Sequence, residues 1–217
     1  MTINTRTVVF GSRLAAAGLV LALGVSGCTR GQMVGTSSSY LIIDSLEAAS
    51  GAVPAVFSGT LGSDVLTYVN KTIDGKQVRV PTIFEDIGKV TFRMALKDPG
   101  GASTPLSPTS ANYITVTRYH VQFIRSDGRN TPGVDVPYAF DGAATGSATV
   151  QPIQMNFILV RAQAKQEAPL LPLVDGGGQI VISTIAEITF YGADQTGRPV
   201  SVVGRISVNF ADWGDPG

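Results

Sequence analysis

The folded part of this chain is built from short runs in which apolar and polar side chains alternate, the pattern of half-buried β-strands. In residues 89–97, Val90, Phe92, Met94 and Leu96 point to one face and their polar neighbours point to the other. The same criterion predicts strands at residues 40–46, 65–70, 77–80, 113–125, 155–161, 185–192 and 200–210. A weaker edge strand is expected at residues 134–140, where Pro137 removes a backbone donor.

Turn residues separate these runs and pair some of them into hairpins. Asp74-Gly75 is a strong signal for a tight turn between residues 65–70 and 77–80, and residues 194–197 join the last two strands. Residues 98–112 hold three prolines and two glycines and are expected to form a loop. Little helix is expected: a short turn at residues 47–50, and a helical turn or a loop at residues 162–168.

Many short strands with frequent turns predict an all-β protein, a single antiparallel sandwich of two sheets. The loop at residues 98–112 could separate two domains, but residues 40–98 alone offer too few strands and too little core to fold independently. We therefore expect one β-sandwich domain over residues 40–217.

Two segments resemble parts of immunoglobulin-like and fibronectin type III modules. Residues 118–128, with the sequence Arg-Tyr-His-Val-Gln-Phe-Ile-Arg-Ser-Asp-Gly, resemble the third strand and turn of such modules. Residues 188–197 and the strand after them resemble the final hairpin. The resemblance covers about the second half of the folded part and implies a sandwich of that kind. The core tryptophan of antibody-type domains is missing, because the only tryptophan is Trp213, near the end of the chain. Their paired cysteines are also missing, because the chain has a single cysteine.

The first 28 residues carry a targeting pattern. Residues 1–13 contain Arg6 and Arg13 and no acidic residue, and residues 14–25 are apolar. The sequence Val25-Ser26-Gly27-Cys28 then resembles the lipobox of bacterial lipoproteins. The resemblance implies that the Cys28 thiol receives a diacylglyceryl group and that a signal peptide, residues 1–27, is cleaved off. Residues 28–39 would then form an acylated, flexible tether, which as a coil of 11 residues after Cys28 spans about 18 Å.

Two other interpretations of this segment compete with the lipoprotein. A transmembrane helix over residues 14–27 would span about 21 Å, which is less than the hydrocarbon core of about 30 Å. In an ordinary secretory signal Cys28 would be a bystander, yet a single cysteine in an exported chain forms no internal disulfide and needs another explanation. Thr29 stands where an aspartate would, in many bacteria, retain a lipoprotein in the inner membrane. The outer membrane is therefore the favoured location in the cell envelope.

Charge and composition exclude some classes of partner. Cleavage before Cys28 removes 27 of the 217 residues, including two arginines, and leaves 14 lysines and arginines against 16 acidic residues. Without a basic surplus, nucleic acid is not expected as a partner. Two or more acyl chains hold a protein firmly on a membrane, so the expected partners are the membrane itself and an envelope protein, a surface protein or a polysaccharide.

The sequence offers few groups for catalysis or metal binding. His120 is the only histidine, which excludes sites that need several histidines, and its strand position places it on the polar face beside Arg118 and Gln122. There is no G-x-S-x-G motif, and the glycines at 176–178 lack the Lys-Ser/Thr of a phosphate-binding loop. We therefore expect no catalytic residues, no cofactor and no resident metal.

Two groups of carboxylates remain as candidates. Asp127, Asn130 and Asp135 could supply oxygen ligands for Ca²⁺, although Asp-Gly-Arg-Asn is also ordinary turn chemistry. Glu85 and Asp86 are adjacent, so on a strand they would point to opposite faces, and a two-carboxylate glycosidase site would need partners from elsewhere in the chain.

Three functions are compatible with the sequence. The favoured one is a lipid-anchored, non-catalytic β-sandwich that acts in binding or in envelope structure. The second is a carbohydrate-active envelope enzyme that uses carboxylates on loops. The third is a carrier of small ligands, which would need a closed barrel with an apolar cavity.

Overall fold

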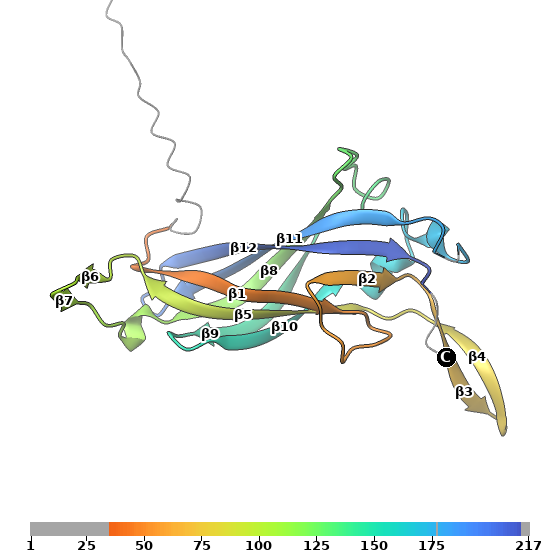
Figure 1. The fold of residues 1–217 in the computed structure, drawn as a ribbon, viewed down its shortest axis with the longest axis horizontal. Coiled ribbons are helices and arrows are strands. Elements are labelled where there is room, and N and C mark those ends of the chain that lie inside the picture. Colours follow the sequence, from red (N-terminus) through yellow and green to blue (C-terminus); the bar gives the residue numbers. More distant parts are fainter. Residues whose placement is uncertain (1–34, 177, 214–217) are drawn as a thin grey trace, which may run out of the picture.

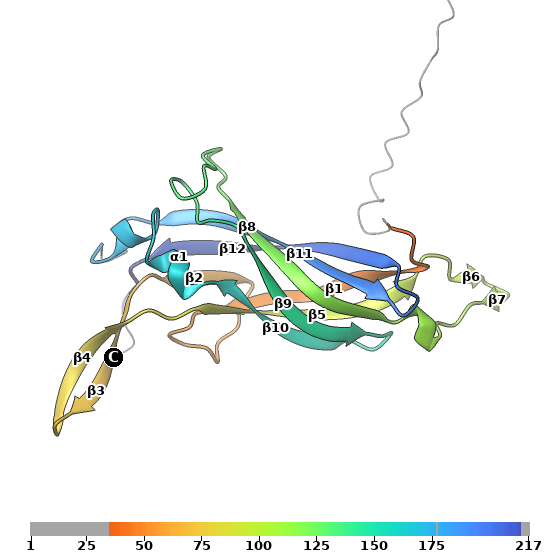
Figure 2. The same ribbon diagram turned by 180° about the vertical axis from the view of Figure 1, so that it is seen from behind.

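The computed structural model describes residues 35–176 and 178–213, and these residues form an all-β protein. The predictions for residues 1–27, for Cys28 and for most of the tether lie outside the described residues. A three-stranded sheet and a five-stranded sheet face each other, and two small hairpins extend from opposite ends of the pair (Figures 1 and 2). Both sheets lie between Ser39 and Ala211, so this part of the chain contains the strands and the core of the fold.

The three-stranded sheet has the order β1-β5-β10, and both of its strand pairs are antiparallel. Its strands are β1 (Ser39–Ala49), β5 (Asp86–Leu96) and β10 (Ile153–Val160). The helical turn expected at residues 47–50 is wrong, because β1 continues to Ala49. Glu47 pairs there with Lys89 of β5 at 2.9 Å. At the start of β1, Ser37 and Ser39 are buried, so the body of the protein begins slightly before Tyr40.

The five-stranded sheet has the order β2-β12-β11-β8-β9. Its strands are β2 (Thr60–Asp64), β8 (Ile114–Ile124), β9 (Phe140–Ala148), β11 (Ile182–Asp194) and β12 (Pro199–Ala211). The expected final hairpin is confirmed as β11 and β12. One pair departs from the antiparallel prediction, since β2 runs parallel to β12.

The strand expected at residues 134–140 is wrong, and the real edge strand is β9. β9 consists mostly of small residues, so it shows no alternation of large apolar and polar side chains. One of them, Gly142, lies against the Tyr119 ring, and a Cβ atom at this position would come within 2.1 Å of that ring. Short elements connect the sheets. They are the 3₁₀ helices η1 (Ser110–Asn112) and η2 (Leu171–Leu173), the hairpin β6 (Gly100–Gly101) with β7 (Thr104–Pro105), and the four-residue helix α1 (Ala162–Lys165).

Aromatic rings from both sheets fill the space between them. The Phe190 ring of β11 lies 4.9 Å from the Phe92 ring of β5 and 5.2 Å from the Phe157 ring of β10, measured between ring centroids. Tyr119 of β8 adds a contact to Phe157 at 5.2 Å, and its hydroxyl accepts a hydrogen bond from the Ile158 backbone. Burial raises the pKa of the Tyr119 hydroxyl. These contacts join the two sheets into one core.

The turn between β11 and β12 is held by Asp194. Burial acts to raise the pKa of its carboxyl, but hydrogen bonds from Thr196, Ser37 and Arg198 outweigh burial and lower that pKa to about 2. Oδ1 of Asp194 accepts the Thr196 hydroxyl at 2.6 Å and the Arg198 amide at 3.0 Å. The charged carboxylate therefore stabilises this turn.

Asp194→Asn is expected to lower the free energy of unfolding at neutral pH by about 1–2 kcal/mol. Because the folded-state pKa lies below the ordinary value, the stabilisation is present above about pH 4 and is lost as the pH falls towards about 2. Urea unfolding of both proteins between about pH 3 and pH 7 measures the difference. A difference that stayed constant or widened on acidification would contradict this role of Asp194.

Candidate functional site

The hairpin of β3 (Thr67–Ile73) and β4 (Lys76–Thr82), here called the arm, extends beyond the two sheets (Figures 1 and 2). The sequence predicted this hairpin correctly. Its turn is Asp74-Gly75, with positive φ values of 51° and 75°, as a two-residue hairpin turn requires. β3 and β4 pair only with each other, so among the described residues each has one edge without a neighbouring strand.

The two faces of the arm differ in chemistry. One face, here called the aliphatic face, carries the cross-strand pairs Val69 with Val80, Lys71 with Val78, and Ile73 with Lys76. The opposite face holds the arm's aromatic ring, with the Arg79 guanidinium 5.1 Å from the centre of the Tyr68 ring. On the aliphatic face Ile73 is 49% exposed and Val78 is 41% exposed. β-Branched side chains so open to solvent form an apolar surface that the described protein leaves uncovered.

The arm is also basic, whereas the rest of the described protein is acidic. Residues 35–176 and 178–213 contain 13 basic and 15 acidic residues. The arm holds three of the basic residues and one of the acidic ones, so 10 basic and 14 acidic residues remain outside it. A surface of this kind attracts a negatively charged partner to the arm and repels it from the body.

The two chain segments at the root of the arm are tied to each other. Ser63, at the end of β2, precedes the arm, and Asp86, at the start of β5, follows it. The Ser63 hydroxyl donates a hydrogen bond of 2.6 Å to Oδ2 of Asp86. Both side chains are fully buried, so this bond closes the base of the arm inside the protein.

Lys165 completes the root with a buried ion pair. Its Nζ lies 2.9 Å from Oδ2 and 3.0 Å from Oδ1 of Asp86, and the two side chains are 1% and 0% exposed. Helix α1 ends at Lys165 and brings it to this position. The Gly51 amide donates a further hydrogen bond of 2.9 Å to Oδ1 of Asp86. A buried charge needs such a full set of partners, because water is not available to solvate it.

A second buried carboxylate, Asp64, fixes the first strand of the arm. It accepts hydrogen bonds from the Thr67 hydroxyl at 2.5 Å and from the Trp213 amide at 3.0 Å. Burial raises the pKa of Asp64, while these hydrogen bonds and the charge of Lys165 act in the opposite direction. The root therefore combines β2, β3, β5, α1 and the C-terminal segment, and it sets the direction in which the arm leaves the body.

The structure separates the candidate residues that the sequence had placed together. Glu85 is exposed and Asp86 is buried, so the expectation that they point to opposite faces is confirmed. The sequence did not reveal that Asp86 pairs with Lys165, which lies 79 positions further along the chain. Composition offered no signal for this pair, because a lysine in a short polar segment is normally solvated.

His120 lies on the polar face of its strand, as expected, while Tyr119, Val121 and Phe123 are buried on the other. Its Nδ1 is 3.3 Å from Asp141 of β9, and the imidazole side chain is 31% exposed. Arg118 lies 4.2 Å from the centre of the Tyr191 ring on the same outer face. A hollow of about 500 Å³ opens beside Arg118 and Tyr191. The imidazole and carboxylate form a pair on the outer surface of the sheet.

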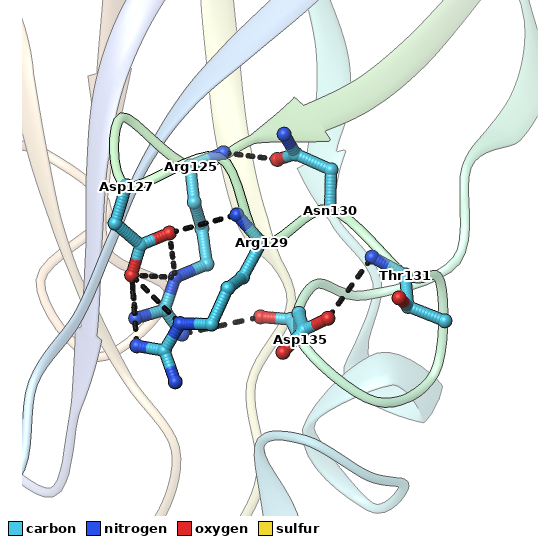
Figure 3. Close-up of polar contacts among 6 residues, drawn as sticks. All are labelled: Arg125, Asp127, Arg129, Asn130, Thr131 and Asp135. Atoms are coloured by element: carbon cyan, nitrogen blue, oxygen red, sulfur yellow. Dashed lines mark hydrogen bonds and ion pairs between the residues drawn. The ribbon is translucent and has the colours of Figure 1, made fainter.

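Asp127, Asn130 and Asp135 lie on one loop, but their oxygens face arginines and backbone amides (Figure 3). The Asp127 carboxylate contacts the guanidinium groups of Arg125 at 2.7 Å and of Arg129 at 2.8 Å, and these hydrogen bonds hold its pKa well below the ordinary range. Asn130 accepts the Arg125 amide at 2.6 Å, and Asp135 accepts the Thr131 amide at 3.2 Å. The proposed calcium ligands are therefore engaged in ordering the loop.

Within residues 35–176 and 178–213, no group of three or more His, Cys, Asp or Glu side chains is arranged to hold a metal ion. The helices in the same part of the chain are too short or too polar to cross a membrane.

Comparison of the chain with protein-family models, with curated proteins and with solved structures finds no match.

Proposed function

We propose that this chain is a lipid-anchored protein of the bacterial cell envelope, in which a non-catalytic β-sandwich acts in binding. The observation that carries the proposal is the arm, an exposed, basic and partly apolar hairpin on a base that is tied together by buried charges. Burying the two charges at the base has an unfavourable desolvation free energy. We infer that the ion pair is kept because it fixes the direction in which the binding element leaves the body. Binding needs a positioned surface of this kind and does not need a set of catalytic groups.

The order of the strands supports an immunoglobulin-like or fibronectin type III-like sandwich. The seven long strands, in chain order, are β1, β5, β8, β9, β10, β11 and β12. The first, second and fifth form one sheet, and the seventh, sixth, third and fourth form the other. Fibronectin type III modules are built in this order, and the arm is then an insertion between their first two strands. Modules of this class serve mainly as scaffolds whose loops and insertions bind partners.

The position of the arm suits a protein held at its N-terminus. β1 starts at the end of the molecule where β6 and β7 lie, and the arm leaves from the other end (Figure 1). As an extended strand of 11 residues, β1 alone spans about 36 Å. An anchor at Cys28 would therefore hold the body by one end and present the arm at the other. We place the anchor in the outer membrane, following Thr29.

Cys28→Ser is expected to abolish incorporation of labelled palmitate and to leave residues 1–27 uncleaved. The hydroxyl of serine cannot accept the thioether-linked lipid, and cleavage by the lipoprotein peptidase depends on that lipid. Palmitate labelling and the size of the protein on a denaturing gel measure both effects, with globomycin treatment of the wild type as an independent block of cleavage. Ser26→Ala is the matched control, because it keeps a small residue in the lipobox and should leave labelling unchanged. A Cys28→Ser protein that stayed membrane-bound and was processed like wild type would contradict the proposal.

A further inference from the structure

We propose that the aliphatic face of the arm docks on the surface of an anionic phospholipid bilayer. This inference rests on the proposed binding function and names the partner of the arm. The docking surface consists of Val69, Lys71 and Ile73 on β3 with Lys76, Val78 and Val80 on β4. Its aliphatic side chains would enter the boundary between headgroups and acyl chains, and its lysines would reach the lipid phosphates.

The composition of this face distinguishes a lipid partner from a protein partner. Binding energy at protein interfaces is concentrated on Trp, Tyr and Arg, and lysine is depleted there. Beyond the Thr67–Thr82 pair at the root of the arm, the aliphatic face carries Val, Ile and Lys side chains. The residues that would suit a protein partner, Tyr68 and Arg79, lie on the opposite face and contact each other. Binding at a lipid–water interface instead scales with buried apolar area and with electrostatic attraction to anionic lipids, and this face offers both apolar side chains and lysines.

Charge favours an anionic surface and determines which part of the protein approaches it. The arm has a net charge of +2, from Lys71, Lys76, Arg79 and Asp74, whereas the rest of the described protein has 14 acidic residues against 10 basic ones. An anionic bilayer therefore attracts the arm and repels the body. A second copy of the chain is a poor occupant of the same face, because twofold packing would bring together two surfaces of the same positive charge.

The arm lies at the end of the protein opposite to the start of β1, so a bilayer that faces the anchoring membrane can reach it (Figure 1). It extends past both sheets in the two opposite views (Figures 1 and 2), and Ile73 and Val78 of its aliphatic face are largely open to solvent. The Ser63–Asp86 hydrogen bond and the Lys165–Asp86 ion pair hold its root. A fixed root means that little conformational freedom is lost when the arm binds, which favours docking.

Vesicle co-sedimentation tests the proposal on residues 28–217 with Cys28→Ser, a form that contains the whole core and no acyl chain. The probes are vesicles of phosphatidylcholine alone and vesicles with about one quarter phosphatidylglycerol. With an unchanged arm, this form should bind the anionic vesicles and not the neutral ones. The additional substitutions K71Q/K76Q should weaken its binding about thirtyfold, because each lysine near the anionic surface contributes about 1 kcal/mol. I73S/V78S should weaken it about tenfold, because apolar contact is lost at unchanged charge.

The matched control is Q154E/N156E, which changes the net charge as K71Q/K76Q does but on exposed positions of β10. It should bind nearly as wild type, since only the arm touches the lipid. Equal binding to both kinds of vesicle, or equal loss in the control, would overturn the proposal. So would lysine-dependent binding to soluble poly-L-glutamate without binding to vesicles, or dimerisation that K71Q/K76Q abolishes. The tested protein has no acyl chain, so a failure to bind vesicles would contradict the docking of the arm and would not bear on the proposed anchor at Cys28.

Discussion

Lys165→Met is expected to lower the free energy of unfolding by about 3–5 kcal/mol, the usual cost of removing one partner from a buried ion pair. The Asp86 carboxylate would keep its hydrogen bonds from Ser63 and Gly51 but would lose the only cation that contacts it among the described residues. A buried carboxylate without a counter-charge is poorly solvated, and this unpaired charge is the main source of the expected cost.

Urea unfolding measures this cost, and two variants make the result specific. Lys71→Met removes an exposed lysine of the arm and should change stability by less than about 0.5 kcal/mol. The double variant Asp86→Leu/Lys165→Met removes both charges and should be more stable than Lys165→Met alone, because no buried charge is left unpaired. If Lys165→Met cost no more than Lys71→Met, the ion pair would not be what holds the root of the arm.

Phe190→Ala is expected to lower the free energy of unfolding by about 3–5 kcal/mol, through lost burial and the cavity left behind. Phe190 is 0% exposed, and its ring contacts Phe92 and Phe157, which belong to the opposite sheet. Its removal therefore weakens the contact between the two sheets, and backbone relaxation cannot easily close a gap at the centre of the core.

Chemical denaturation with Val203→Ala as the control checks this expectation. Val203 lies on the neighbouring strand β12 and is 46% exposed, so its truncation should cost less than about 0.5 kcal/mol. Comparable losses for Phe190→Ala and Val203→Ala would mean that the two sheets are not joined through this aromatic cluster.

Alternation of side chains predicted the strands that have one buried face. β5, β8 and the β11–β12 hairpin were found in this way, since their apolar residues recur at every second position. β9 was missed because its side chains are small and Gly142 packs against the Tyr119 ring instead of offering an apolar side chain. β2 was missed for a similar reason, and its parallel pairing with β12 is a long-range contact that no local pattern encodes.

Only part of the candidate site could be predicted from the sequence. The arm was predicted, because Asp74-Gly75 between two β-branched runs is a local signal. The root of the arm was not predicted, because Ser63, Asp86 and Lys165 come from three distant segments and only the packing of the sheets brings them together. Conversely, Asp127, Asn130 and Asp135 are close in sequence and stay close in the structure, but arginine side chains and backbone amides use the oxygens that a cation would need.

The central claim is that the arm binds an anionic bilayer and that the two packed sheets serve as its scaffold. Amide hydrogen exchange on residues 28–217 with Cys28→Ser, with and without vesicles containing phosphatidylglycerol, tests it most directly. The account predicts slower exchange in residues 67–82 with these vesicles and unchanged exchange in β8, β11 and β12. Unchanged exchange in the arm, or slower exchange on the outer face of the five-stranded sheet around Arg118 and Tyr191, would contradict it.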